Sequence, residues 1–166
     1  MLPIAGADAP TVVSSWDVLT GKAEINGHCA IIGGGLVGTE TAEYVVEKGC
    51  KASIIEMTDK IANGESSTIL PIIMTDFAKN DVKQYVNTKV NSIINDGKTI
   101  LATDTKEEKE VVIDCDTIIM AVGSVKNLLD TEGVTTPIYY AGDCSGERTA
   151  SIAEAIRGGY KAANAI

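Results

Sequence analysis

The sequence is poor in the side chains from which most catalytic and metal sites are built. It contains one histidine, one tryptophan, one phenylalanine and two arginines among its 166 residues. A histidine-based triad and a metal site with imidazole ligands are therefore not expected, and we predict no catalytic residue and no metal ligand on this chain. The scarcity of aromatic and arginine side chains also leaves no obvious substrate pocket.

The four cysteines lack the spacing of a functional site. None of them forms a C-x-x-C pair or a pattern typical of metal ligands. Cys29 and Cys50 lie in segments that we predict to be core strands, which favours buried, unreactive thiols. This is the pattern of a reducing compartment, and we interpret Cys144 as structural.

Positive charge and long apolar runs are also scarce. Fourteen lysines and arginines against 23 acidic residues give a net charge of −9, so nucleic acid and anionic membrane surfaces would not be attracted. No apolar run approaches the roughly 18 residues of a membrane span, and the start Met1-Leu2-Pro3 does not resemble a signal peptide. We expect a soluble, cytoplasmic protein with no nucleic-acid partner and no membrane partner.

The most informative stretch, His28–Met57, has the pattern of one βαβ unit. Its parts in order are an apolar run at 28–32, a glycine turn, a helical run from 36 to about 48 and a second apolar run at 52–57. Gly33, Gly35 and Gly38 fit the G-x-G-x-x-G fingerprint, and Glu56 stands where an acid that binds ribose belongs. The sequence therefore predicts a dinucleotide site, although a βα corner that uses glycine only for packing is the alternative.

Each residue type in the fingerprint has a physical reason. Gly33 permits a tight strand exit, Gly35 lets a pyrophosphate approach the backbone, and Gly38 lets the helix lie close to the strand. The first-turn amides would point at the anion, which the helix dipole favours. Glu56 would accept both ribose hydroxyls, whereas the 2′-phosphate of NADP(H) would meet a like charge. The NAD(H)-binding residues predicted in this stretch are Gly33, Gly34, Gly35, Leu36, Val37, Gly38 and Glu56.

The remaining periodicity predicts an α/β fold. The expected elements are a short strand at 11–13, a short helix at 15–19, a helix ending near 80, strands at 82–86, 89–94, 99–103, 110–113 and 116–122, a helical patch at 127–130, a strand at 138–141 and a helix at 149–165. We interpret this order as a Rossmann-like parallel sheet in which an antiparallel β-meander takes the place of one crossover helix.

Several of these features resemble two-dinucleotide flavoproteins of the glutathione-reductase type. They are the glycine fingerprint, the meander, a strand ending in Ala121-Val122-Gly123, and the run Tyr140-Ala141-Gly142-Asp143-Cys144. In such proteins an NAD(P)H domain is inserted into an FAD domain. The resemblance implies that Asp143 contacts the ribityl–pyrophosphate region of FAD in the whole protein.

A closer resemblance is to the old-yellow-enzyme-related NADH:flavin oxidoreductases, which include 2,4-dienoyl-CoA reductase and 2-enoate reductase types. It rests on Ser15–Leu19, Gly33–Tyr44 and Ala155–Tyr160. That family implies a longer protein with an FMN-bearing (β/α)₈ barrel, an iron–sulfur cluster, and FAD and NAD(P)H domains. The resemblance therefore implies that this chain is part of a larger flavoenzyme, whose FAD domain and FMN barrel are its partners.

On that resemblance the chain has three parts. Residues 1–26 would be a lead-in segment from the FAD domain, 27–123 the NAD(H)-binding domain, and 124–166 an incomplete returning strand and helix of the FAD domain. Glu40 would lie near the nicotinamide, with a solvated helix-surface carboxylate as the alternative. Gly123 would line the dinucleotide cleft, with a plain turn glycine as the alternative.

The expected function is NADH binding and the passage of hydride from NADH to FAD. An enoate or an enoyl- or dienoyl-CoA would be reduced elsewhere in the full protein, so the isolated chain is expected to be inactive and FAD to bind only to the full-length protein. One alternative is part of an NADH oxidase or a ferredoxin-reductase-like flavoprotein. Another is a non-enzymatic NADH-binding module.

Overall fold

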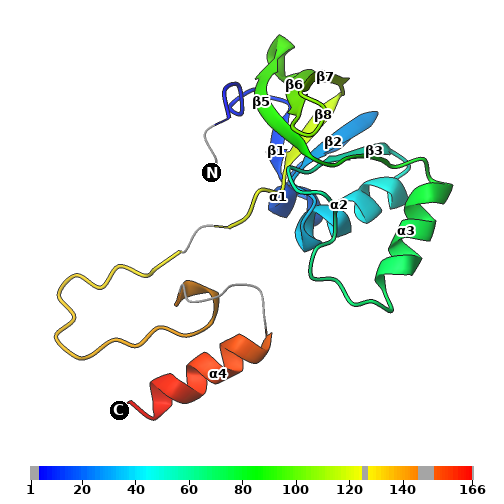
Figure 1. Ribbon diagram of the computed structural model, residues 1–166. Helices are drawn as coiled ribbons and strands as arrows, with labels where there is room; N and C mark the ends of the chain where they lie inside the picture. Colours follow the sequence, from blue (N-terminus) through cyan, green and yellow to red (C-terminus); the bar gives the residue numbers. More distant parts are fainter. Residues whose placement is uncertain (1–3, 125–126, 146–151, 166) are drawn as a thin grey trace. The chain divides into compact units, whose positions relative to one another are not determined.

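The chain forms two compact units. The computed structural model describes residues 4–124, 127–145 and 152–165, and it divides into Met1–Gly123 and Ser124–Ile166 (Figure 1). The first unit contains both sheets and three of the four α-helices, while the second contains the fourth. We describe each unit by itself.

A five-stranded parallel sheet is the centre of the first unit. Its strand order is β1 (Val12–Ser14), β8 (Thr117–Met120), β2 (His28–Ile32), β3 (Lys51–Ile55) and β4 (Lys83–Tyr85). All neighbouring strands run parallel. The central strands are apolar runs because both of their faces are covered, as is usual for parallel sheets. The Rossmann-like α/β fold expected from the sequence is confirmed.

The meander is a separate three-stranded antiparallel sheet. It consists of β5 (Thr88–Ile94), β6 (Thr99–Asp104) and β7 (Lys109–Asp114), with the short 3₁₀ helix η1 (Asn95–Gly97) at the first turn. The meander lies between β4 and β8 in the chain. The sequence predicted that a meander takes the place of a crossover helix at this point. That prediction is confirmed.

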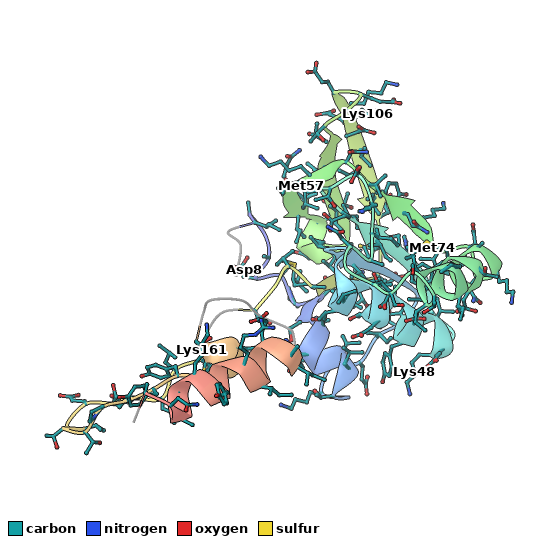
Figure 2. All side chains as sticks on the ribbon, turned by 60° about the horizontal axis from the view of Figure 1, so that its bottom comes forward. Asp8, Lys48, Met57, Met74, Lys106 and Lys161 are labelled. Atoms are coloured by element: carbon teal, nitrogen blue, oxygen red, sulfur yellow. The ribbon has the colours of Figure 1, made fainter. Side chains whose placement is uncertain are left out.

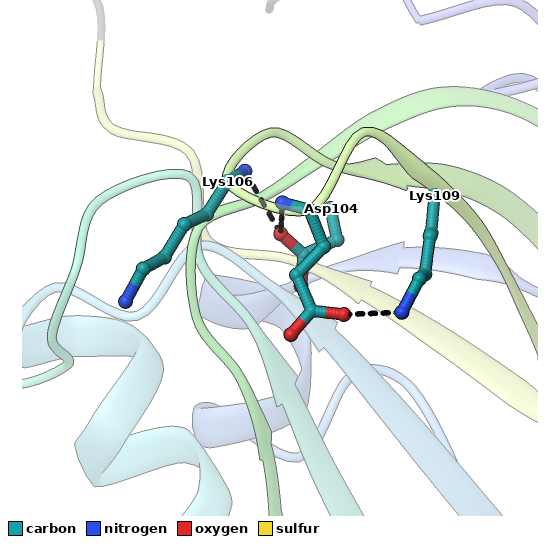
Figure 3. Close-up of polar contacts among 4 residues, drawn as sticks. Asp104, Lys106 and Lys109 are labelled. Atoms are coloured by element: carbon teal, nitrogen blue, oxygen red, sulfur yellow. Dashed lines mark hydrogen bonds and ion pairs between the residues drawn. The ribbon is translucent and has the colours of Figure 1, made fainter.

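The tip of the meander is held by local polar contacts. One oxygen of the Asp104 carboxylate accepts hydrogen bonds from the backbone N–H groups of Lys106 and Glu107, both at 2.9 Å (Figure 3). These two bonds lower the pKa of the Asp104 carboxyl below its usual range. Lys109 pairs with Glu107 at 2.7 Å on the exposed surface. Lys106 marks this end of the β6–β7 hairpin, away from the helices of the first unit (Figure 2). The charged tip is therefore a self-contained turn.

The sheet divides the first unit into two cores. On one face, Ile31 packs with α2 (Leu36–Glu47) and α3 (Leu70–Lys79), and α1 (Ser15–Leu19) contributes Val18 to the same core. On the other face, Ile32 packs with side chains of the meander, including Ile100. Alternate residues of β2 thus face opposite layers, which is the period of a strand.

The N-terminal segment joins this unit through backbone pairing. Val12 pairs with Ile118 in parallel register, so β1 extends the sheet beyond β8. Ser14 caps α1 by accepting the backbone N–H of Asp17 at 3.0 Å. Trp16 follows on α1 with 61% of its surface exposed, so its side chain is not part of the core of this unit.

Two elements that the sequence predicted in the second unit are absent from its described residues. Residues 127–130 form no helix, and 138–141 form no strand. A strand needs a neighbour for its backbone hydrogen bonds, and no described segment pairs with 138–141 despite its suitable side chains. The predicted terminal helix is present as α4 (Ile152–Ala163), and its predicted start at Thr149 lies outside the described residues.

Burial makes two of the thiols unreactive. Cys29 lies in β2 and Cys115 lies just before β8, and both are buried. Burial raises the pKa of Cys29 to about 12 and that of Cys115 to about 11. Cys50 and Cys144 are only partly buried. The expectation of a buried thiol is confirmed for Cys29 and is wrong for Cys50, which lies at the end of a turn before β3 and packs against the core while only partly buried.

We predict that iodoacetamide at pH 8 labels Cys50 and Cys144 in the native chain but not Cys29 or Cys115. The buried pair would present almost no thiolate and no access at that pH. Peptide mass spectrometry of the alkylated protein measures this pattern, and labelling in denaturant provides the control in which all four react. Fast native labelling of Cys29 would contradict the burial described here.

Candidate functional site

The glycine turn connects the central strand β2 to helix α2. Gly33 has φ +104°, a conformation that residues with a Cβ rarely adopt, and a Cβ there would lie 2.5 Å from the carbonyl oxygen of Ala121. A Cβ on Gly38 would overlap the carbonyl oxygen of Gly33, so α2 lies directly against the turn. Gly34 is equally restricted, because its Cβ would lie 2.7 Å from Cγ2 of Ile61. These three glycines are required by the packing of the chain itself.

Gly35 is different because nothing in the chain requires it. Its φ of −68° suits any residue, and no atom lies within 4 Å of the position that its Cβ would take. The residue is exposed and caps the N-terminus of the twelve-residue helix α2. The open space therefore lies at the positive end of a helix dipole, where backbone N–H groups favour an anion.

Glu56 follows β3 and is held against the glycine turn. Its Oε2 accepts the N–H of Gly34 at 2.6 Å, and its Oε1 accepts the N–H of Thr58 at 2.8 Å. Partial burial alone would raise the pKa of this carboxyl, but these backbone hydrogen bonds outweigh it and hold the pKa below the ordinary value. Glu56 is thus an anion with one oxygen bonded to the glycine turn and the other bonded to the backbone after β3.

The loop after Glu56 also packs on the turn. The N–H of Ala62 donates to the carbonyl of Gly34 at 2.7 Å, and Ile61 and Ala62 are both buried. Residues 58–66 are mostly polar, so the sequence predicts a loop there and gives no expectation of this contact. The signal that could have found it is the apolar pair Ile61-Ala62 within an otherwise polar stretch.

A cavity of about 510 Å³ opens beside the turn. Gly33, Gly35 and Glu56 line it together, as the sequence predicted for one site. The other walls come from the ends of β8 and β5 and from the N-terminal segment, with Ala121, Val122, Met57, Thr88, Lys89, Val90 and Ile4 among the lining residues. The cavity lies at the carboxyl ends of β2, β3 and β8, where the strand order reverses. Open α/β sheets bind their ligands at this point.

None of the other predicted site residues is among those that line this cavity. Val37 is exposed on the first turn of α2, and Leu36 is partly buried there. Glu40 is exposed on the next turn, and Gly123 has φ +92° beyond the end of β8; neither is among the residues that line the cavity. Asp143 belongs to the second unit, in the 3₁₀ helix η2 (Gly142–Cys144).

The residues fit a dinucleotide in two respects. The vacant position at Gly35 would admit a pyrophosphate to the amides of α2, and the carboxylate of Glu56 can accept ribose hydroxyls within the same cavity. Among the described residues, no group of three or more histidine, cysteine, aspartate or glutamate side chains could hold a metal ion. Within that same part of the chain, every helix is too short or too polar to cross a membrane.

Comparison with known proteins gives consistent matches. Residues 3–159 match the pyridine nucleotide-disulphide oxidoreductase family. A bilirubin reductase of Mediterraneibacter gnavus (strain CC55_001C) is 38% identical over 167 residues, covering 99% of this chain and 25% of that protein. An NADH oxidase of Thermoanaerobacter brockii is 31% identical over 160 residues, covering 92% and 24% respectively. The structure of 2-naphthoyl-CoA reductase with 2-naphthoyl-CoA matches with a TM-score of 0.85 at 29% identity, covering 100% of this chain and 25% of that one. The chain therefore spans about a quarter of the length of these relatives.

We predict that Gly35→Val abolishes measurable NADH binding while leaving the fold intact. The branched side chain meets open space in the chain but occupies the volume that a pyrophosphate needs. Because valine is a poorer N-cap than glycine, the change should lower the free energy of unfolding by about 1 kcal/mol, which leaves the chain folded. Calorimetric titration with NADH and urea unfolding measure the two effects separately.

Gly38→Ala is the matched control for this experiment. It adds one methyl group to the same fingerprint, but against the Gly33 carbonyl, so it should cost about 1–3 kcal/mol of unfolding free energy through overpacking. Unchanged NADH affinity in a folded Gly35→Val variant would show that the glycines serve only the packing of the βα turn.

Proposed function

The chain belongs to the pyridine nucleotide-disulphide oxidoreductase family, and from this premise we propose that it binds NADH and presents it to FAD in a longer flavoenzyme. Members of this family use FAD and NAD(P)H. The observation that carries the proposal is the cavity shared by Gly35 and Glu56, which offers an anion site and a ribose acceptor together. In this function the bound dinucleotide supplies the hydride, and the chain itself supplies binding and orientation.

The described residues have separate tasks in this proposal. The amides of Leu36, Val37 and Gly38 would bind the pyrophosphate, and the absence of a side chain at Gly35 would give it access. Glu56 would accept the ribose hydroxyls of the adenosine half, and Glu40, on the next turn of α2, would lie toward the nicotinamide. No residue of the chain needs to act as an acid, a base or a nucleophile, because hydride transfer takes place between cofactors.

The selectivity follows from the charge of Glu56. Its lowered pKa keeps the carboxylate ionised, and its two hydrogen bonds to Gly34 and Thr58 keep it at the cavity wall. The 2′-phosphate of NADPH would be brought close to this charge, and no arginine is among the residues that line the cavity. NADH is therefore the proposed cofactor.

The second unit has an exposed apolar surface that suits packing against another part of the same enzyme. Ile152, Ile156 and Tyr160 are 82%, 70% and 72% exposed and lie four residues apart, so they form one apolar stripe along α4. The similar proteins are about four times as long as this chain. We propose that the stripe packs on the remainder of an FAD domain, and that Asp143 contacts FAD there, with an FMN barrel and an iron–sulfur cluster elsewhere in the enzyme.

The final acceptor is proposed to be an enoate or an enoyl- or dienoyl-CoA. The similarity to 2-naphthoyl-CoA reductase, a protein named for an unsaturated acyl-CoA, favours this class. The second candidate is an NADH oxidase, which is favoured by the 31% identity to the Thermoanaerobacter brockii protein of that name. The acceptor would be bound outside the described residues in either case.

We predict that the chain binds NADH more tightly than NADPH, by about 1–3 kcal/mol, and that Glu56→Gln removes most of this difference. Glutamine has the same size and can still accept one backbone hydrogen bond, but it carries no charge. Calorimetric titrations of both nucleotides against both proteins measure the preference. Equal or tighter NADPH binding by the unaltered chain would reject the assignment to NADH.

We also predict that the 166-residue chain retains no FAD and oxidises no NADH when mixed with both cofactors. Binding of the flavin pyrophosphate in this class needs a glycine fingerprint, and the one in this sequence is assigned to NADH. Flavin absorbance after gel filtration and the loss of NADH absorbance at steady state are the measurements. Stoichiometric flavin with continuous NADH consumption would mean that the chain is a complete enzyme.

A further inference from the structure

The N-terminal arm, defined as residues 4–7, is fastened to the edge of the meander. Ala5 forms a parallel bridge with Ser92, and its carbonyl accepts the N–H of Ile93 at 2.8 Å. A Cβ on Gly6 would overlap the carbonyl oxygen of Ile93, so this glycine lets the arm lie flat against β5. The N–H of Ala7 then closes a turn on the carbonyl of Ile4 at 3.1 Å. The arm is therefore an ordered part of the first unit.

This attachment places Ile4 in the wall of the cavity. Ile4 lines it together with Val90 and Val122, and it packs on the core between the parallel sheet and the meander. β5 begins directly beside the ribose acceptor, since the N–H of Thr88 donates to the backbone carbonyl of Glu56 at 2.8 Å. The wall that contains Ile4 is thus continuous with the strand that borders Glu56.

We propose that the arm completes the nucleotide site, with Ile4 as a positioning residue for the adenosine half of NADH. The inference rests on the proposed binding of NADH in this cavity. With the ribose held by Glu56, the flat face of the base needs an apolar surface on the β5 side, and Ile4 extends that surface from the arm. An apolar contact of this kind stabilises the base by removing its face from water.

The test is calorimetric titration of the full chain with NADH and with ADP-ribose, which lacks the nicotinamide. Ile4→Ala should raise the dissociation constants of both ligands by about tenfold, which corresponds to the loss of roughly 1.4 kcal/mol of contact. The matched control is Ile25→Ala. Ile25 is partly buried like Ile4, but it packs on the opposite core, next to the helices, and does not line the cavity. That variant should keep the affinity for both ligands.

A second variant tests the arm without altering the cavity wall. Gly6→Ala should push the arm away from Ile93. It should weaken NADH binding to a similar extent as Ile4→Ala, even though Gly6 does not line the cavity. Thermal unfolding of each variant shows that the loss of affinity is not a loss of fold.

Three results distinguish a failure of the proposed role of Ile4 from a failure of the proposed NADH binding. Unchanged affinity in Ile4→Ala, while Gly35→Val abolishes binding, would overturn the inference and leave the NADH site intact. Weaker binding of NADH with unchanged binding of ADP-ribose would overturn the assignment of Ile4 to the adenosine half. Unchanged affinity in both Ile4→Ala and Gly35→Val would reject the cavity as the nucleotide site altogether.

Discussion

The backbone of Gly34 is held at both its N–H and its carbonyl, and the geometry of the cleft depends on this arrangement. Its N–H donates to the carboxylate of Glu56, and its carbonyl accepts from Ala62. The turn between β2 and α2 is therefore tied to the end of β3 and to the loop beyond it. A glycine-rich turn would otherwise have many conformations, and these two bonds favour the one that leaves Gly35 facing open space.

This arrangement gives Glu56 two tasks. Its carboxylate orders the turn through backbone hydrogen bonds, and it remains available to a ligand, because each carboxylate oxygen can accept more than one bond. An acid at this position is therefore a structural part of the turn and, in the proposed function, also the ribose acceptor. The lowered pKa of Glu56 has its cause in the same contacts.

The elements that the sequence predicted well are those with a local cause. β2, α2 and β3 follow from apolar periodicity interrupted by glycine, and the meander follows from alternation between turn residues. The segment 138–141 has equally suitable side chains, yet it is not a strand because pairing depends on a neighbour that periodicity does not reveal. The hydrogen bond from Gly34 to Glu56 and the place of Ile4 in the cavity wall were not foreseen for the same reason. Both depend on contacts between residues far apart in the chain.

The position of β8 in the sheet has a consequence for the order in which the molecule can form. β8 lies between β1 and β2, although it follows both of them by more than eighty residues. During synthesis on a ribosome, β1 and β2 emerge first. The hydrogen bonds that join them through β8 can form only after Thr117–Met120 has emerged. Ala121 and Val122, which line the cleft, emerge later still. The cleft can therefore be complete only after this late segment has joined the sheet.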